Sequence, residues 1–237
     1  AKNGDPDALA EIAALYQKDT EVDSNQDIAK ELFIEAAEQG SGQAAFEMGA
    51  QYEFGEHGVK RQLVEAANWY KKAANFGYAF AAYRLGELSE RGWGVPYSQQ
   101  DATNWYQKAA DDEVLPATVK LAERYFIGLG APQDWGKALH LFRIAAHKED
   151  PFSQYMLSEF YRQGLLGEVD LEQSVYWYYR AENTSANARA KYQVGVLFWK
   201  GKGFEQNLEK AFQWILRSAQ QDYVQAQMTL GDFYSQG

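Results

Sequence analysis

Small and apolar residues recur along the chain at a nearly constant interval. A small residue stands at Ala13 and returns every 36 or 37 residues as far as Gly231. Further columns keep the same step: alanine or serine five residues earlier, usually an aromatic residue three later, and usually glycine six later. The small column is Ala13, Gly49, Gly86, Ala122, Ser158, Gly195 and Gly231. A period that holds its register over the whole chain indicates an internal repeat.

Each repeat contains a second apolar stripe. In the second copy Ala66 opens this stripe and is followed by Trp69, Tyr70 and Ala73. Offsets of three, four and seven place side chains on one face of an α-helix. The glycine after the first stripe is typical of a left-handed helix C-cap. Each repeat is therefore predicted to be a helix A, a glycine turn, a helix B and a short return loop.

Helix starts can be predicted from polar residues and prolines. Residues able to accept the free amide hydrogens of a helix start precede most helix B stripes, and Asp5-Pro6 and Asp150-Pro151 combine a cap with a first-turn proline. The column before helix B is Asn25, Gln62, Ser98, Asp134, Asp170 and Asn207. Since one repeat cannot bury its apolar face alone, stacked neighbours form the core. The sequence thus predicts an all-α solenoid of antiparallel helix pairs, with fourteen helices or slightly fewer.

These residues resemble the Sel-1-like repeat family, a relative of the tetratricopeptide repeat. Residues 44–77 match its pattern best, through Gly58-Val59, Trp69-Tyr70 and Lys72-Ala73-Ala74, and residues 81–110 match nearly as well. The resemblance covers essentially the whole chain. It implies a right-handed superhelical array that serves as an adaptor in assembly or signalling, in many cases in bacteria and often exported. A periplasmic or otherwise exported location is therefore favoured over a cytoplasmic one.

About six and a half repeats are expected in a single array over residues 1–237. They are placed near residues 5–40, 41–77, 78–113, 114–149, 150–185 and 186–222, with a partial copy at 223–237. The first residues match the close of a helix B and the last match the end of a helix A. The chain also does not begin with Met, so we expect it to be a segment of a longer protein.

Several repeats depart from the family pattern. The first lacks the glycine turn, the fourth has Leu141-Phe142 in place of the Trp-Tyr pair, and the fifth carries Leu165-Leu166 between its glycines. The glycine of the return loop is replaced at Glu113, Glu149, Ser185 and Asp222. Two interpretations remain open: local geometry adapted to one partner, or neutral drift.

Composition argues against several classes of function. The formal charge of −10 disfavours nucleic acid, because binding phosphates needs a basic surface. There is no cysteine for a disulfide, a thiolate zinc site or a nucleophile. No apolar run reaches the eighteen or so residues that a membrane-spanning helix needs.

Candidate chemistry is sparse. No serine has a lysine three residues later, the pairing used by penicillin-recognising enzymes. His140 and His147 lie two helical turns apart, too far to chelate a metal together without a third ligand, and His57 is predicted to lie in a turn. The acidic stretch at residues 19–27 resembles a calcium loop but lacks its glycine and its closing glutamate. We therefore predict no catalytic residue, no metal site and no cofactor.

A partner surface is predicted on the helix A faces, which line the concave wall of tetratricopeptide-like arrays. Aromatic residues and arginines there are the types that binding hot spots favour. The residues are Phe46, Phe80, Tyr83, Arg91, Phe152, Tyr155, Arg162, Arg189, Tyr192 and Trp199. The column of Phe46, Tyr83, Tyr155 and Tyr192 could equally pack between neighbouring helices. An apolar strip from the third repeat to the sixth is predicted, formed by Phe80, Tyr83, Phe152, Tyr155, Tyr192 and Trp199, with Pro116, Val119, Phe126 and Ile127 at the same offsets in the fourth repeat.

The function predicted is a non-catalytic scaffold that binds a protein or peptide partner. The alternative is a carbohydrate-polymer binder or a polysaccharide-export scaffold, since aromatic rows also stack on sugar rings. The oligomeric state is left open.

Overall fold

The computed structural model describes residues 5–18, 23–165, 167–182, 187–202 and 204–235, and these residues form thirteen helices and no strand. The first six helices are α1 (Pro6–Lys18), α2 (Asp23–Glu38), α3 (Gly42–Phe54), α4 (Leu63–Asn75), α5 (Ala79–Arg91) and α6 (Gln99–Asp111). The next seven are α7 (Leu115–Ile127), α8 (Trp135–His147), α9 (Pro151–Gln163), α10 (Leu171–Glu182), α11 (Asn187–Lys200), α12 (Leu208–Ala219) and α13 (Val224–Ser235). The prediction of an all-α array of helix pairs is confirmed. The predicted features at residues 19–22, Leu166, Ser185 and Gly237 lie outside the described residues.

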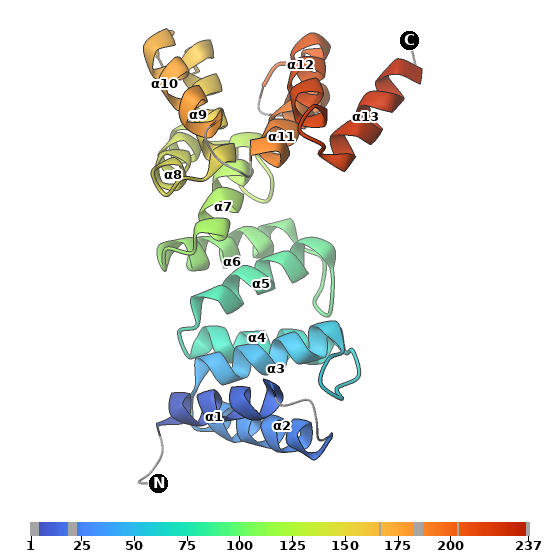
Figure 1. Ribbon diagram of the computed structural model, residues 1–237. Coiled ribbons are helices and arrows are strands. Elements are labelled where there is room, and N and C mark those ends of the chain that lie inside the picture. Colours follow the sequence, from blue (N-terminus) through green and yellow to red (C-terminus); the bar gives the residue numbers. More distant parts are fainter. Residues whose placement is uncertain (1–4, 19–22, 166, 183–186, 203, 236–237) are drawn as a thin grey trace. The chain divides into compact units, whose positions relative to one another are not determined.

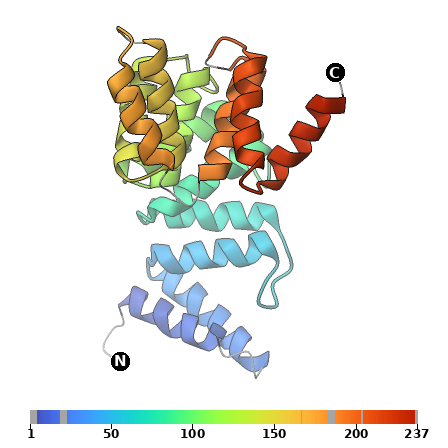
Figure 2. The same cartoon turned by 45° about the horizontal axis from the view of Figure 1, so that its top comes forward.

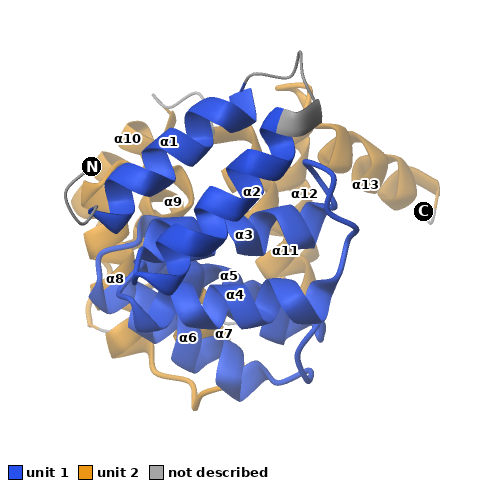
Figure 3. Ribbon diagram, turned by 90° about the horizontal axis from the view of Figure 1, so that it is seen from below, with its two compact units in different colours: residues 1–117 blue, residues 118–237 orange. Residues whose placement is uncertain are grey.

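The chain divides into two compact units, residues 1–117 and residues 118–237 (Figure 3). In the first unit, α1 pairs with α2, α3 with α4, and α5 with α6, and each pair contacts the next through its adjacent helices (Figure 1). In the second unit, α9 contacts α8, α10 and α11, and α12 contacts both α11 and α13 (Figure 2).

The small column allows helix A and helix B of one repeat to approach closely. A Cβ added to Gly49 would lie 2.6 Å from the Tyr70 ring, and one added to Gly86 would lie 2.5 Å from the Tyr106 ring. Both rings are fully buried. The tyrosine of helix B therefore occupies the space that the missing side chain of helix A leaves.

The helix B caps follow the predicted column at most positions. The side chains of Ser98, Asp134 and Asn207 each accept a backbone N–H three residues later. Asp170 accepts the N–H of Gln173 at 3.0 Å in the same way. Gln62 stands at the cap position without a side-chain hydrogen bond. The cap prediction is wrong for Asn25, because α2 begins at Asp23 and Asn25 lies inside it.

The return loops keep their geometry where glycine has been replaced. Gly77 has a φ of 83°, and Glu113, Glu149 and Asp222 have φ values of 61°, 66° and 59°. These three acidic residues hold a left-handed conformation that costs a residue with a Cβ roughly 1–2 kcal/mol. The loss of glycine has therefore left the backbone of these loops unchanged and added strain.

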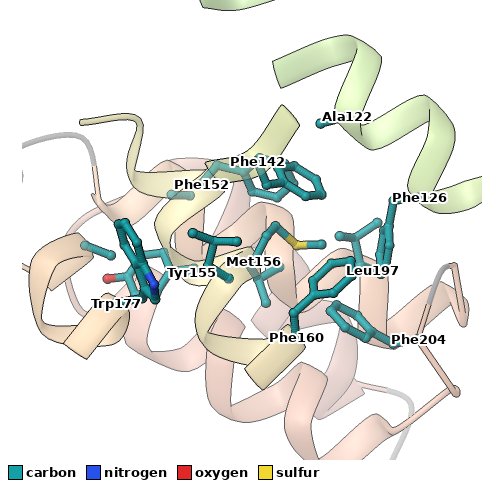
Figure 4. Packing of buried hydrophobic residues seen from close by; sticks show 14 of the residues in the cluster. Ala122, Phe126, Phe142, Phe152, Tyr155, Met156, Phe160, Trp177, Leu197 and Phe204 are labelled. Carbon is teal, nitrogen blue, oxygen red and sulfur yellow. The ribbon is translucent and has the colours of Figure 1, made fainter. Parts of the chain in front are cut away.

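The core of the second unit is rich in aromatic rings. Phe204, from the loop before α12, stacks on Phe198 with ring centroids 4.5 Å apart and meets Phe126 of α7 edge-on at 4.8 Å. Phe160 of α9 lies 5.3 Å from Phe126 in the same cluster. Figure 4 shows Phe126, Phe160 and Phe204 of this cluster together with Met156 and Leu197. One ring cluster thus joins side chains of three successive repeats, from α7 to the loop before α12.

Candidate partner-binding surfaces

Three predicted residues form a half-exposed aromatic row in the first unit. Phe46 of α3 meets Phe80 of α5 edge-on at 6.2 Å, and Phe80 meets Tyr83 at 5.4 Å. Phe80 is 41% exposed, whereas Phe46 and Tyr83 are half-buried. Phe46 also contacts the buried Tyr70 at 5.3 Å. Phe46, Phe80 and Tyr83, here called the aromatic row, thus have one edge on the core and one edge in solvent.

A charged network lies on the same two A helices. The carboxylate of Glu53, which is 4% exposed, accepts a hydrogen bond of 2.7 Å from the Tyr70 hydroxyl. Arg84 bridges Glu53 and Glu87. Burial, reinforced by the neighbouring Glu87 carboxylate, raises the pKa of Tyr83 to about 12. Tyr83 therefore stays a neutral hydroxyl at physiological pH.

Arg91, the arginine predicted for a partner surface in the first unit, lies at the surface of that unit. Arg91 is exposed, and its guanidinium lies 4.7 Å from the centroid of the Trp93 ring. Trp93 is itself 38% exposed. An exposed arginine over an exposed tryptophan offers both a charge and an apolar face.

In the second unit, two predicted surface residues belong to the core. Phe152 is 3% exposed and packs edge-on against Phe142 at 5.9 Å. Tyr155 is fully buried between Tyr178 and Trp214, with ring centroids 5.6 and 5.0 Å away. The expected exposure of both rings is wrong, because side chains from helix B of the same and neighbouring repeats cover them. An apolar strip that includes Phe152 and Tyr155 is therefore not present on the surface of this unit.

The remaining aromatic residues of the prediction are half-buried against the last repeat. Tyr192 lies 5.4 Å from the Tyr223 ring, and Trp199 meets Phe233 of α13 edge-on at 5.0 Å. Arg189 is exposed, whereas Arg162 is half-buried and paired with Glu159. The structure thus brings Phe46, Phe80 and Tyr83 together as one half-exposed row in the first unit, whereas the predicted residues of the second unit lie at separate positions.

The second unit has a cleft that the sequence did not predict. It has a volume of about 540 Å³ and lies between the helix B members α10 and α12, with α9 also contributing to its lining. Its most buried lining residues include Trp214, which is 6% exposed. They also include Ser158 and Ser174, whose hydroxyl groups are hydrogen-bonded to each other. Tyr178 and Tyr179 of α10 line it as well.

Part-buried hydrogen bonds connect residues that lie behind the aromatic lining of the cleft, where Tyr155 packs on Tyr178 and Trp214. Tyr155 donates to Glu182 at 3.0 Å, and Glu182 accepts from Lys191 at 2.8 Å. Burial alone would raise the pKa of Glu182, but the hydrogen bonds from Lys191, Tyr178 and Tyr155 outweigh it and lower that pKa. Burial, together with the nearby Glu182 carboxylate, raises the pKa of Tyr178 to about 12. Tyr178 therefore stays a neutral hydroxyl at physiological pH, held by its hydrogen bonds with Glu182 and Arg217.

Sequence reasoning missed the cleft because its aromatic residues stand in the structural columns. The column of Tyr178 is buried in the other described repeats, and the column of Trp214 is buried or half-buried in each of them. Only the spacing of helices sets what part of each ring faces the cleft. A usable signal does exist on α12. Lys210, Trp214 and Arg217 stand at offsets of four and seven, which places two cations and an aromatic residue on one helix face.

Clustered metal ligands and helices able to span a membrane are both absent from the described residues. Within them, no three His, Asp or Glu side chains lie together as metal ligands would. None of the described helices has the length and apolar character needed to cross a membrane. His140 and His147 are both exposed, and the Nδ1 atom of His147 lies 2.7 Å from the Arg143 carbonyl oxygen.

Paired helices with a small-residue column and a glycine cap define an α-solenoid repeat protein. The family model of the Sel1 repeat matches residues 6–41, 42–78, 79–113, 115–150, 151–183 and 188–223. The chain therefore belongs to the Sel1 repeat family. Sequence comparison with curated proteins gives no match.

Similar solved structures come from bacteria. The protective antigen c5321 of uropathogenic Escherichia coli, which displays an SLR fold, is 30% identical over 98% of this chain, with a TM-score of 0.76. This chain spans about half of that protein, 50% of its length. A Sel1 repeat protein from Oxalobacter formigenes is 30% identical and has a TM-score of 0.67. The alignment covers 90% of this chain and 85% of the Oxalobacter chain. A putative Sel1 repeat protein from Klebsiella pneumoniae shares the fold, with a TM-score of 0.58 and 22% identity. The alignment covers 86% of this chain and 98% of the Klebsiella chain.

Proposed function

We propose that this chain is a non-catalytic scaffold that binds a protein or peptide segment on the helix A surface of its first unit. Sel1 repeat proteins are generally scaffolds for protein–protein interaction and are generally not enzymes. The partner and the position of its binding site are part of this proposal.

The observation that carries the proposal is the aromatic row. Phe80 is 41% exposed while it contacts two other rings, so a partner could bury more of an aromatic surface that is already ordered. Ordered rings lose little conformational entropy on binding and are frequent among hot spots. Arg91 and Trp93 add an exposed cation and a second ring to the same unit.

A selection from a random peptide display library on the immobilised protein tests the proposal. Enriched peptides would be labelled and titrated by fluorescence anisotropy against the wild type and Phe80→Ala. We expect Phe80→Ala to weaken binding about tenfold. The matched control is Tyr97→Ala, which removes a 67% exposed ring of the same unit outside the row and should leave the affinity unchanged. Equal affinity of Phe80→Ala and the wild type would contradict the proposal.

A parallel oligosaccharide array separates the carbohydrate alternative. Peptide binding supported by Arg91 should weaken as salt screens the charge, whereas stacking of a sugar on the row should depend little on salt. Retention of an oligosaccharide that is lost in Phe80→Ala, with no peptide enriched, would favour a carbohydrate ligand.

A further inference from the structure

The cleft of the second unit combines apolar walls with two cations, Lys210 and Arg217, that form no ion pair with a described carboxylate. Val175 and Tyr179 of α10, which are 52% and 64% exposed, line it together with Trp214. A volume of about 540 Å³ lies within the range of ordinary ligand pockets. The space and its lining therefore suit an apolar side chain.

The charges around the cleft differ in sign from the chain as a whole. Its lining carries three cations, Arg162, Lys210 and Arg217, against two carboxylates, Glu159 and Glu209, although the whole chain has a formal charge of −10. Arg162 and Glu159 form an ion pair and neutralise each other. Lys210 and Arg217 then remain beside one carboxylate, Glu209, so the lining keeps a net positive charge of one.

Neither cation of α12 forms an ion pair with a described carboxylate. Arg217 donates a hydrogen bond of 3.2 Å to the Tyr178 hydroxyl and lies over the Trp214 ring at 5.8 Å. The ammonium group of Lys210 lies 5.2 Å from the centroid of the Phe198 ring. These contacts position both cations without a direct ion pair, so an anionic ligand would gain attraction without displacing a paired carboxylate.

The spacing of the two cations indicates the form of the ligand. Seven residues of α-helix separate them by about 10 Å along the axis, with Trp214 between them. In an extended peptide, alternate side chains point to the same side and lie about 6.6 Å apart. In such a peptide, two acidic residues four positions apart and the apolar residue midway between them all point to the same side. The two carboxylates would then face the flexible side chains of Lys210 and Arg217, while the apolar side chain enters the cleft.

We propose that the cleft between α10 and α12 binds a short acidic peptide segment of a partner protein, with an apolar side chain inserted beside Trp214 and Tyr179 and carboxylates on Lys210 and Arg217. This site is separate from the aromatic row, so it adds a second contact point to the proposed scaffold.

The test uses the whole chain and the synthetic peptide acetyl-Ser-Glu-Ser-Phe-Ser-Glu-Ser-amide carrying a fluorescent label. Anisotropy titrations should show saturable binding that weakens about tenfold in Arg217→Gln and in Lys210→Gln. Replacing the phenylalanine of the peptide with alanine should weaken binding to a similar degree. Tyr179→Ala should also lower the affinity. The matched controls are Lys202→Gln and Tyr176→Ala, an exposed cation and an exposed ring that do not line the cleft, and neither should change the affinity.

A charge exchange guards against loss of binding through misfolding. The double variant Lys210→Glu with Arg217→Glu should reject the glutamate peptide and bind a matched peptide with both glutamates replaced by lysine, and its circular dichroism should match the wild type. A dissociation constant of about 1 mM corresponds to a binding free energy of only about −4 kcal/mol. Absence of saturable binding up to that peptide concentration would overturn the proposal. Equal affinity of Arg217→Gln and the wild type for the peptide would also overturn it. If the protein bound heparin, a polyanion without apolar side chains, as well as it binds the peptide, and if replacing the phenylalanine of the peptide did not change the affinity, the cleft would attract negative charge alone and the proposal would also be overturned. Loss of binding in Phe80→Ala with no loss in the cleft variants would place the peptide on the aromatic row and overturn the proposal.

Discussion

Gly86→Ala is the substitution that most directly tests the packing of helix A on helix B. The new Cβ would lie 2.5, 2.7 and 2.9 Å from three atoms of the Tyr106 ring, whereas unbonded carbon atoms prefer separations of about 3.5–4.0 Å. Tyr106 is fully buried, so the ring has no free space to enter and the two helices must separate. Such overpacking typically costs about 1–3 kcal/mol.

A matched substitution isolates this clash from helix propensity. Alanine in place of glycine inside a helix stabilises it by about 1 kcal/mol, and this gain applies to both Gly86→Ala and Gly231→Ala. Gly231 belongs to the same column, but a Cβ there would meet nothing within 4 Å. We therefore expect Gly231→Ala to stabilise by up to about 1 kcal/mol and Gly86→Ala to destabilise by up to about 2 kcal/mol.

Urea unfolding followed by circular dichroism measures both free energies. A double-mutant cycle adds the decisive comparison, because Tyr106→Leu removes the ring atoms that the new Cβ would meet. In that background, Gly86→Ala should lose most of its cost, which gives a coupling of about 1 kcal/mol or more. If Gly86→Ala were as stabilising as Gly231→Ala in the wild-type background, the assignment of the small column as a close helix contact would be refuted.

Three further predictions concern charges and backbone. Arg84→Met should lower the unfolding free energy by about 2 kcal/mol in urea unfolding, because it leaves the buried Glu53 without its cation; Lys137→Met, which removes an exposed pair with Asp134, should change it by less than about 1 kcal/mol. The lowered pKa of Glu182 means that the folded state binds this proton more weakly than the unfolded state, so its contribution is present above pH 4.5, the ordinary value, and is lost as the pH falls further. Glu182→Gln should therefore flatten the acid limb of stability between about pH 5 and about pH 3 in thermal unfolding, and a limb as steep as that of the wild type would contradict this. Glu149→Gly should raise the unfolding free energy by about 1 kcal/mol by relieving the left-handed strain at a φ of 66°, and a decrease would show that the side chain contributes more than its backbone costs.

The helices could be predicted because their determinants are local. Alanine and aromatic residues at offsets of three, four and seven define the helix faces, and caps such as Ser98 and Asp134 act within three residues of their own position. Asn25 is the exception. Its column position matched the other caps, but α2 begins two residues earlier, at Asp23.

The surface could be predicted only in part, because exposure depends on more distant neighbours. Phe46 and Tyr155 hold the same position in their repeats, yet Phe46 remains half-buried while Trp214 of the next repeat covers Tyr155. The cleft depends on the distance between α10 and α12, which belong to different repeats. Periodicity within one repeat carries no information about that distance, so the sequence pattern could not show the cleft.

The match between a small residue and a ring within one repeat has a consequence for how such a chain can evolve. Gly49 leaves room for Tyr70, Gly86 for Tyr106, and Gly195 for Ile215, always within the same helix pair. Duplication, deletion or exchange of a whole repeat carries both partners together and preserves this fit. Recombination between helix A and helix B would instead combine side chains of different bulk. The repeat, and not the single helix, is therefore the unit that this family can gain or lose without rebuilding its core.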